Sequence, residues 1–429
     1  MRAALWFLAC SFAASAAGAQ DVDEAVAPEA AEAHTDAADV APLEAPPAAD
    51  EGAPPPAASV EAGPRRGRPP PALQAGAPPP AGAAPPSAAW AEGGPGEAAP
   101  GRASGEAPPA AATEARESGG EPSWTDGLAI HGFADAYVQG TWTLPEPFSG
   151  DQSATIGHRA FDRINGLTVS FVGLDVEYDG NDFGATLNLR FGTSVPYLLG
   201  PTSGLPDGMQ FLKQAFVSWR PFEGAQIEFG QFDTIYGAEV SESWQNHNYS
   251  RGALYNLVQP FYHTGFRVAY APPGSGLTFT GLAVNGWNNV LDNNDGKTFG
   301  LQVGYENGPI TVSAGYLAGP EGDGNDELWR HFGDVVVSVA IGDLELTANA
   351  DYVAEDLGGG TFDQLWGVML SGRLRFPPYV ALGLRGEYVG DPDTGWGLGT
   401  GTFTIEVTPL EHLILRLDNR VDVATSPDF

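Results

Sequence analysis

The sequence predicts an all-β protein: an antiparallel transmembrane β-barrel of about 15 to 16 strands, preceded by a disordered Pro/Ala-rich segment. Three observations predict this fold. Apolar and polar residues alternate with a period of two from Asp126 onward, the links between the alternating stretches are by turns short and long, and the chain begins like an exported protein. Outside the N-terminus there is no run of 18 or more apolar residues, so no ordinary transmembrane helix is expected.

Residues 1–19 are predicted to be a secretory signal peptide. Arg2 precedes an apolar stretch from Leu5 to Ala17, and Ala17-Gly-Ala19 is a small-x-small cleavage pattern. We interpret Cys10 as a plain apolar residue of this peptide, because the apolar core before it is too short for a lipoprotein signal. A single cysteine also excludes a disulfide framework and a cysteine-based zinc site.

Residues 20–123 are predicted to be a disordered periplasmic segment. They hold 21 of the 37 prolines, 17 acidic residues and five arginines, and Trp90 is their single aromatic residue. Such a composition cannot bury enough apolar surface to offset the entropy of the chain. Proline triplets such as Pro54–Pro56 favour extended polyproline segments, so we interpret this stretch as a linker or spacer.

Residues 124–429 are predicted to form the barrel domain. In residues 344–352, for example, leucine, alanine and tyrosine occupy one face, whereas Glu345, Thr347, Asn349 and Asp351 occupy the other. No sustained helical period competes with this alternation. The fifteen expected strands are residues 127–140, 165–178, 183–192, 209–220, 225–233, 262–271, 276–287, 297–306, 309–318, 329–341, 343–353, 364–376, 379–389, 399–408 and 412–423.

Aromatic residues near the strand ends favour a membrane barrel over a soluble β-sandwich. A barrel in a bilayer turns its apolar face to lipid and carries aromatic girdles at both interfaces. Scattered aromatic residues at the rim of a sandwich are the alternative. The residues concerned are Trp219, Tyr270, Trp287, Tyr305, Tyr316, Tyr352, Trp366, Tyr379 and Tyr388.

The lengths of the links also indicate an outer-membrane barrel. Short turns, such as residues 179–182 and 307–308, are expected to alternate with longer polar links along the whole domain. Bacterial barrels have short periplasmic turns and long external loops, and they close with an even number of strands. Fifteen is odd, and residues 424–429 resemble a loop interrupted by Pro427. Either the strand count is short by one or the chain lacks a sixteenth strand; we favour a truncated sequence.

Five motifs carry a resemblance to a known family. In this order they resemble the beta-barrel porin-2 (OmpL-like) family, over about residues 130 to 429. The resemblance implies an outer-membrane channel, and it implies a further strand after a segment like residues 415–422. The motifs are Gly230-Gln-Phe-Asp-Thr-Ile-Tyr-Gly-Ala-Glu239, Asn246-His-Asn-Tyr-Ser-Arg251, Pro260-Phe-Tyr-His-Thr-Gly265, Asn285-Gly-Trp-Asn288 and Asn293-Asn-Asp-Gly-Lys-Thr298.

The expected function is that of a porin in the outer membrane of a Gram-negative bacterium. It would form a water-filled channel for passive diffusion of small hydrophilic solutes or ions, in contact with outer-membrane lipid. Wide porins often form trimers, so a homotrimer is considered. A structural or adhesive barrel with no transport role is the alternative. A nucleic-acid partner is excluded, because the net charge is -34 and the chain has only two lysines.

The candidate site is the longest link between strands, residues 233–261. A barrel of about sixteen strands leaves an aqueous lumen, and a charged loop folded into it would constrict it. A loop capping the rim, with Arg251 in a structural ion pair, is the alternative. The candidate constriction residues are Glu239, Glu242, His247, Tyr249 and Arg251. The candidate lumen-lining residues are Arg190, Arg267, Arg373, Arg375, Arg385, Glu387, Arg416 and Asp418.

No enzymatic activity, cofactor or metal site is expected. The chain has no Gly-x-Ser-x-Gly elbow, and its histidines are scattered singly. His247 has no second ligand at helical or turn spacing. The domain from Trp124 onward holds 37 acidic and 14 basic residues, a net of -23, so we expect a weak preference for cations.

Overall fold

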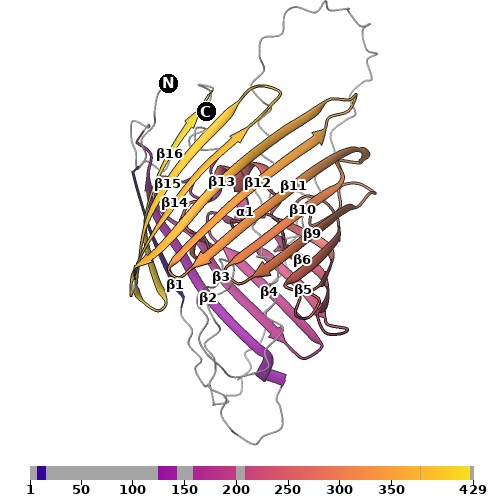
Figure 1. The fold of residues 1–429 in the computed structure, drawn as a ribbon, viewed down its shortest axis with the longest axis horizontal. Coiled ribbons are helices and arrows are strands. Elements are labelled where there is room, and N and C mark those ends of the chain that lie inside the picture. Colours follow the sequence, from indigo (N-terminus) through magenta and orange to yellow (C-terminus); the bar gives the residue numbers. More distant parts are fainter. Residues whose placement is uncertain (1–6, 16–123, 143–157, 200–207, 377, 426–429) are drawn as a thin grey trace, which may run out of the picture. The chain divides into compact units, whose positions relative to one another are not determined.

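The computed structural model describes residues 7–15, 124–142, 158–199, 208–376 and 378–425. Within these ranges, sixteen strands form one antiparallel sheet that closes into a barrel, and each strand pairs with its neighbours in sequence (Figure 1). No described helix is long and apolar enough to cross a membrane. The predicted disordered segment, residues 20–123, lies outside the described residues.

The elements follow one another along the chain with few helices. The strands are β1 (Phe7–Ser15), β2 (Leu128–Gly140), β3 (Gly166–Asp179), β4 (Phe183–Phe191), β5 (Leu212–Trp219), β6 (Ala225–Asp233), β7 (Tyr262–Tyr270), β8 (Leu277–Val284), β9 (Thr298–Asn307), β10 (Ile310–Gly322), β11 (Asn325–Ile341), β12 (Leu344–Asp356), β13 (Phe362–Phe376), β14 (Val380–Gly390), β15 (Gly397–Leu410) and β16 (Leu413–Ala424). The helices are α1 (Val195–Leu198) and α2 (Ala253–Val258), with 3-10 turns η1 (Trp124–Gly127), η3 (Met209–Phe211) and η4 (Ser243–Gln245).

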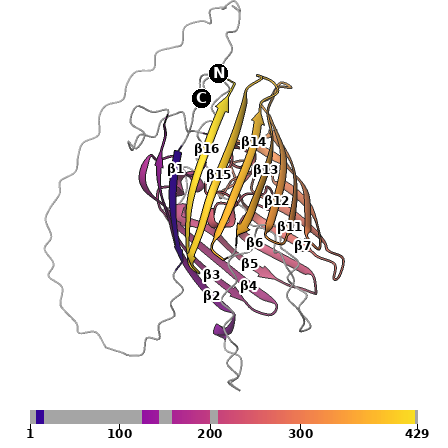
Figure 2. The same ribbon diagram turned by 60° about the vertical axis from the view of Figure 1, so that its left-hand side comes forward.

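Strands β2 to β16 are the fifteen strands that the sequence predicts. The barrel nevertheless closes, because β1 lies between β16 and β2 (Figure 2). Ala9 pairs with Asp418 on β16, and Phe12 pairs with Ala136 on β2. The sixteenth strand of the wall is thus supplied by residues 7–15 of the predicted signal peptide and not by residues after β16. The truncation of the sequence stays a prediction. The signal peptide itself remains a prediction.

The barrel is apolar on its outside and charged on its inside. On β14, the outward Leu384 is 61% exposed, whereas the adjacent Arg385 is 3% exposed. This is the distribution of a barrel whose outer face meets lipid. Eight of the nine aromatic residues expected in the girdles are exposed. Trp287 differs, because it follows β8 in a connection and packs inside against Phe332 at 5.2 Å between ring centres.

The alternation of short and long links has two exceptions. The β12–β13 link, expected to be long, has only five residues, 357–361. The link between β10 and β11, expected to be long, is a two-residue turn at Asp323 and Gly324. The two strands stay paired through their backbones as far as Gly322 and Asn325, beyond the point where apolar and polar side chains stop alternating. Gly324 has φ +62°, a left-handed conformation that glycine adopts without strain. The acidic residues of this segment, Glu321, Asp323, Asp326 and Glu327, therefore lie in the hairpin of β10 and β11.

Candidate functional site

Residues 234–261, which connect β6 to β7, run through the interior of the barrel; we call them the inserted loop. Most of their side chains are buried. They bond to inward-facing side chains of β2, β4, β5, β9 and β12 to β16. These partners lie on several sides of the barrel, so the loop is held from wall to wall.

The first anchor holds Glu242 against β4 and β5. Its carboxylate accepts hydrogen bonds from Lys213 Nζ at 2.8 and 2.9 Å and from Arg190 Nη2 at 2.8 Å. Lys213 also pairs with Asp233 at 2.8 Å. Arg190 also pairs with Asp175 at 2.5 Å. Burial alone would raise the pKa of Glu242, but the charges of Lys213 and Arg190 outweigh it and hold the pKa well below the usual glutamate range.

The second anchor joins Glu239 to β14. Its carboxylate pairs with Arg385 Nη1 at 2.5 Å and accepts the Gly252 backbone N–H at 2.6 Å. Glu387, which lies 3.1 Å from Arg385 Nε, accepts the first two N–H groups of α2 at 3.2 Å each. These N–H groups have no partner within the helix, so the carboxylate satisfies them. Burial raises the pKa of Glu239 despite the opposing charge of Arg385.

The tip of the inserted loop, residues 243–251, is bound through its backbone. Arg416 donates to the carbonyl oxygens of Ser243, Asn246 and Asn248. Asp418 accepts the N–H of Tyr249 at 2.8 Å and that of the next residue at 3.2 Å. The two residues of β16 therefore fix the path of the main chain.

Three more candidate residues brace the tip. The Tyr249 hydroxyl donates to Asp135 at 3.0 Å. Arg251 donates to a loop carbonyl at 2.7 Å, and its guanidinium lies 4.8 Å from the centre of the Phe161 ring. His247 Nδ1 lies 3.0 Å from the hydroxyl of a serine on β13. The described residues contain no group of three or more His, Cys, Asp or Glu that could hold a metal ion.

Glycines on the inner face of the wall admit the loop. A Cβ at Gly300 on β9 or at Gly315 on β10 would overlap the side chain of Tyr236. A Cβ at Gly383 on β14 would overlap the carbonyl oxygen of His247. The loop thus sits in recesses that only glycine leaves open.

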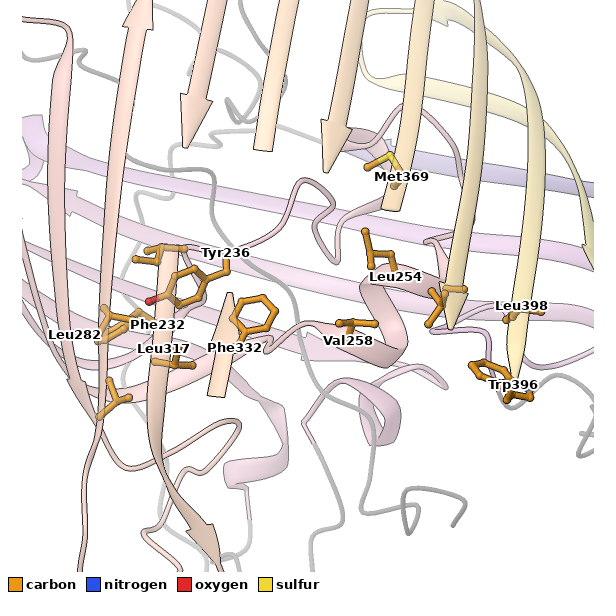
Figure 3. Packing of buried hydrophobic residues seen from close by; sticks show 14 residues of the cluster. Phe232, Tyr236, Leu254, Val258, Leu282, Leu317, Phe332, Met369, Trp396 and Leu398 are labelled. Atoms are coloured by element: carbon orange, nitrogen blue, oxygen red, sulfur yellow. The ribbon is translucent and has the colours of Figure 1, made fainter. Parts of the chain in front are cut away.

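An apolar cluster supplements these polar anchors. Figure 3 shows its members along the barrel interior; α2 carries three of them, of which Leu254 and Val258 are labelled. The Tyr236 ring packs edge-on against Phe332 at 5.5 Å, and its hydroxyl donates to the Tyr316 carbonyl at 3.0 Å. The labelled residues are Phe232, Tyr236, Leu254, Val258, Leu282, Leu317, Phe332, Met369, Trp396 and Leu398.

A second apolar cluster joins the inserted loop to three other connections. It includes Phe161 before β3, Val195 and Leu198 of α1, Tyr255 of α2 and Val290 after β8. The Phe161 and Tyr255 rings pack edge-on at 6.1 Å. Part of the barrel interior is therefore filled by apolar side chains.

The remaining candidate lumen residues lie toward the end with the short turns. Their partners are Glu228 for Arg267, Glu406 for Arg373, and Glu345 for Arg375, the last at 2.6 Å. A cavity of about 480 Å³ also opens here, lined by the β3–β4 and β5–β6 turns and by β7 and β8. Seven of the eight candidate lumen residues therefore form ion pairs inside the barrel. The eighth, Asp418, accepts hydrogen bonds from backbone N–H and hydroxyl groups instead.

Sequence reasoning misses several partners of the loop. Lys213 had a usable signal, because it is one of only two lysines and lies in an alternating stretch. Asp135 and Tyr236 had none, since their partners lie far away in the sequence.

Comparison with known proteins assigns the family. The family model described as "Putative beta-barrel porin-2, OmpL-like" matches residues 127–429. No curated protein matches the chain.

Similar solved structures are outer-membrane proteins of low identity. A loop L8 deletion mutant of OmpT from Vibrio cholerae is 15% identical, with 61% of this chain and 93% of that chain covered and a TM-score of 0.41. An anion-selective porin from Comamonas acidovorans is 12% identical, with 69% and 99% covered and a TM-score of 0.41. OmpF of Salmonella typhi in complex with daunomycin is 14% identical, with 70% and 99% covered and a TM-score of 0.41.

The assignment rests on the family match, which spans the whole described barrel from β2 to β16. The apolar outer face and the charged interior agree with it. The chain therefore belongs to the beta-barrel porin-2, OmpL-like family and is a passive channel of the Gram-negative outer membrane.

Proposed function

We propose that the inserted loop is the constriction of a water-filled channel for small hydrophilic solutes or ions. The observation that carries this is the pair of anchors, Glu242 on β4 and β5 and Glu239 on β14, which stretch a charged loop across the interior. Side-chain charges at a narrow point set which solutes pass. The eight inward-facing charged residues named above would then line the lumen on either side of the loop.

The test is conductance of the purified protein in planar lipid bilayers. The protein should give discrete conductance steps, and Glu242→Gln should give larger ones, because it loses its ion pairs with Lys213 and Arg190. Asp179→Asn is the matched control, since Asp179 pairs with Arg220 at the short-turn end, away from the loop. A complete lack of steps would favour the structural or adhesive barrel, and unchanged steps in Glu242→Gln would remove the loop from the constriction.

The proposal includes two partners and no enzymatic activity. Outer-membrane lipid would cover the exposed apolar face. A homotrimer is proposed as the assembly; OmpT of Vibrio cholerae is described in a trimer form. Mass measurement in detergent tests the trimer, and a monomeric mass would remove it. Release of fatty acid from phospholipid by the purified protein would contradict the proposal that it has no enzymatic activity.

A further inference from the structure

Two acidic residues on the barrel wall face each other without a basic partner. Asp334 on β11 and Asp351 on β12 are directly opposite in the sheet, and they are 3% and 5% exposed. A single amide nitrogen, Asn349 Nδ2, contacts both carboxyl groups, which therefore lie side by side. Among the described residues, no basic side chain acts on either.

Amide groups hold three of the four carboxyl oxygens. Asn349 Nδ2 donates to Asp334 Oδ1 at 2.9 Å and to Asp351 Oδ1 at 3.0 Å. Gln259 Nε2 donates to Asp351 Oδ2 at 2.6 Å. The fourth oxygen, Asp334 Oδ2, is buried and makes no hydrogen bond of normal geometry, although the Gly237 backbone N–H of the inserted loop approaches the same carboxyl group. A buried carboxylate oxygen without a donor is costly, and a proton on it would remove that cost.

The groups around the pair supply no compensating charge. The wall positions opposite Asp334 on β10 and opposite Asp351 on β13 are glycines. The inserted loop contributes the phenol of Tyr236. The carboxylate of Glu239 in the same loop is already paired with Arg385. Farther along β11 and β12, Arg330 and Glu355 pair with each other at 2.7 Å. Two adjacent carboxylates in such surroundings cannot both remain ionised.

The same network ties down both ends of the inserted loop. Asn349 Oδ1 accepts the backbone N–H of Ala238, at the start of the loop, at 3.1 Å. It also accepts Gln259 Nε2, near the end of the loop, at 2.7 Å. Any rearrangement of the two carboxyl groups must therefore move the amides that fix the loop.

We propose that Asp334 and Asp351 share one proton at neutral pH and that this protonated pair is a latch for both ends of the inserted loop. Loss of the proton at alkaline pH leaves two adjacent negative charges, which push the carboxylates apart and break the amide network. The inserted loop then loosens and the channel widens. This inference rests on the constriction role proposed above only for its effect on conductance.

The latch is tested first by labelling Ala238→Cys with a maleimide reagent at pH 7 to 9. Thiol reactivity itself rises with pH, so each rate is divided by the rate in a background that also carries Asp334→Asn, which cannot lose the proton. We expect this ratio to rise with pH, by at most about tenfold per pH unit for a single proton. A ratio that stays constant would overturn the latch.

Infrared spectroscopy and conductance complete the test. Wild-type protein at pH 7 should show the absorption of protonated carboxyl groups, and this absorption should be weaker by one carboxyl group in Asp334→Asn and in Asp351→Asn. Two variants are used so that misfolding of one does not end the experiment. Absence of the band in wild type would overturn the shared proton and favour a bound cation.

Conductance should rise at alkaline pH in wild type and in Asp179→Asn, but not in Asp334→Asn. If the labelling ratio depends on pH but the protein shows no conductance, the pH-dependent release of the loop is supported and the constriction role proposed above is contradicted.

Discussion

Arg385 shows what a buried ion pair contributes in this barrel. Its side chain is 0% exposed and lies between Glu239 of the inserted loop and Glu387 of the wall. Removal of one partner of a buried pair is far more damaging than the net value of the pair, because the remaining charge stays buried. Removal of Arg385 would leave two buried carboxylates, those of Glu239 and Glu387, without this basic partner.

Replacement of Arg385 should therefore release the inserted loop. We expect Arg385→Met to lower the free energy of unfolding by about 3–5 kcal/mol, as for other broken buried pairs. Arg375→Met is the matched control: its side chain is 45% exposed and it also pairs with a carboxylate, so it should cost at most about 1 kcal/mol. Urea unfolding of the purified proteins measures both. Equal losses would show that burial of Arg385 has no special weight.

Glu242 should make the docking of the loop sensitive to acid. Its pKa in the folded protein lies below its unfolded value, so its ion pairs stabilise the docked loop at pH above about 4.3. This contribution is lost as the pH falls below that value toward the depressed pKa. Conductance should therefore rise on acidification below about pH 4. Glu242→Gln should lack this acid response; if it keeps the full response, another carboxyl group is responsible.

At the scale of elements, the wall and the inserted loop fit because glycines stand where the loop touches. Gly383 and Gly386 both lie on β14, but a Cβ at Gly383 would meet the loop, whereas a Cβ at Gly386 would meet nothing within 4 Å. One strand thus offers both a test and its control.

Adding a methyl group should matter at Gly383 and not at Gly386. Gly383→Ala should lower the free energy of unfolding by about 1–3 kcal/mol, the usual cost of overpacking. Gly386→Ala should leave it nearly unchanged. Thermal unfolding measured by circular dichroism distinguishes the two, and a stable Gly383→Ala with unchanged conductance would mean that the loop can shift at no cost.

The sequence could predict the strands but not the packing of side chains inside the barrel. Each strand from β2 to β16 carries its own period of two, which is local information. The length of the link at residues 233–261 and its charges also indicated a constriction. The partners of those charges could not be predicted, because Glu242 finds Lys213 and Glu239 finds Arg385 only after the barrel has closed. The turn at Gly324 was missed because backbone pairing outlasts the side-chain pattern there.

At the scale of the whole molecule, charge is the dominant feature. The domain from Trp124 onward has a net charge of -23. The described basic residues inside the barrel are mostly paired with carboxylates, as Arg190, Lys213 and Arg385 are. The acidic excess lies largely at the ends of strands and in connections, including Asp323 and Asp391.

This distribution should give the channel a weak preference for cations. Acidic groups at a mouth raise the local concentration of cations. Screening acts over about 10 Å at 0.1 M salt, so the preference should shrink in concentrated salt. The reversal potential across a salt gradient measures it. An anion-selective sign would show that the interior arginines govern permeation.

The position of the inserted loop also has a consequence for the order of assembly. Each strand of the wall pairs with a neighbour in sequence, so hairpins can form from nearby residues. The loop instead bonds to residues far downstream, with Glu239 and Arg385 separated by 146 positions and Asn246 and Arg416 by 170. Contacts between such distant residues form late, because the chain between them must be ordered first. Refolding should therefore pass through a closed wall whose interior is still open, and the loop should enter it as the last step.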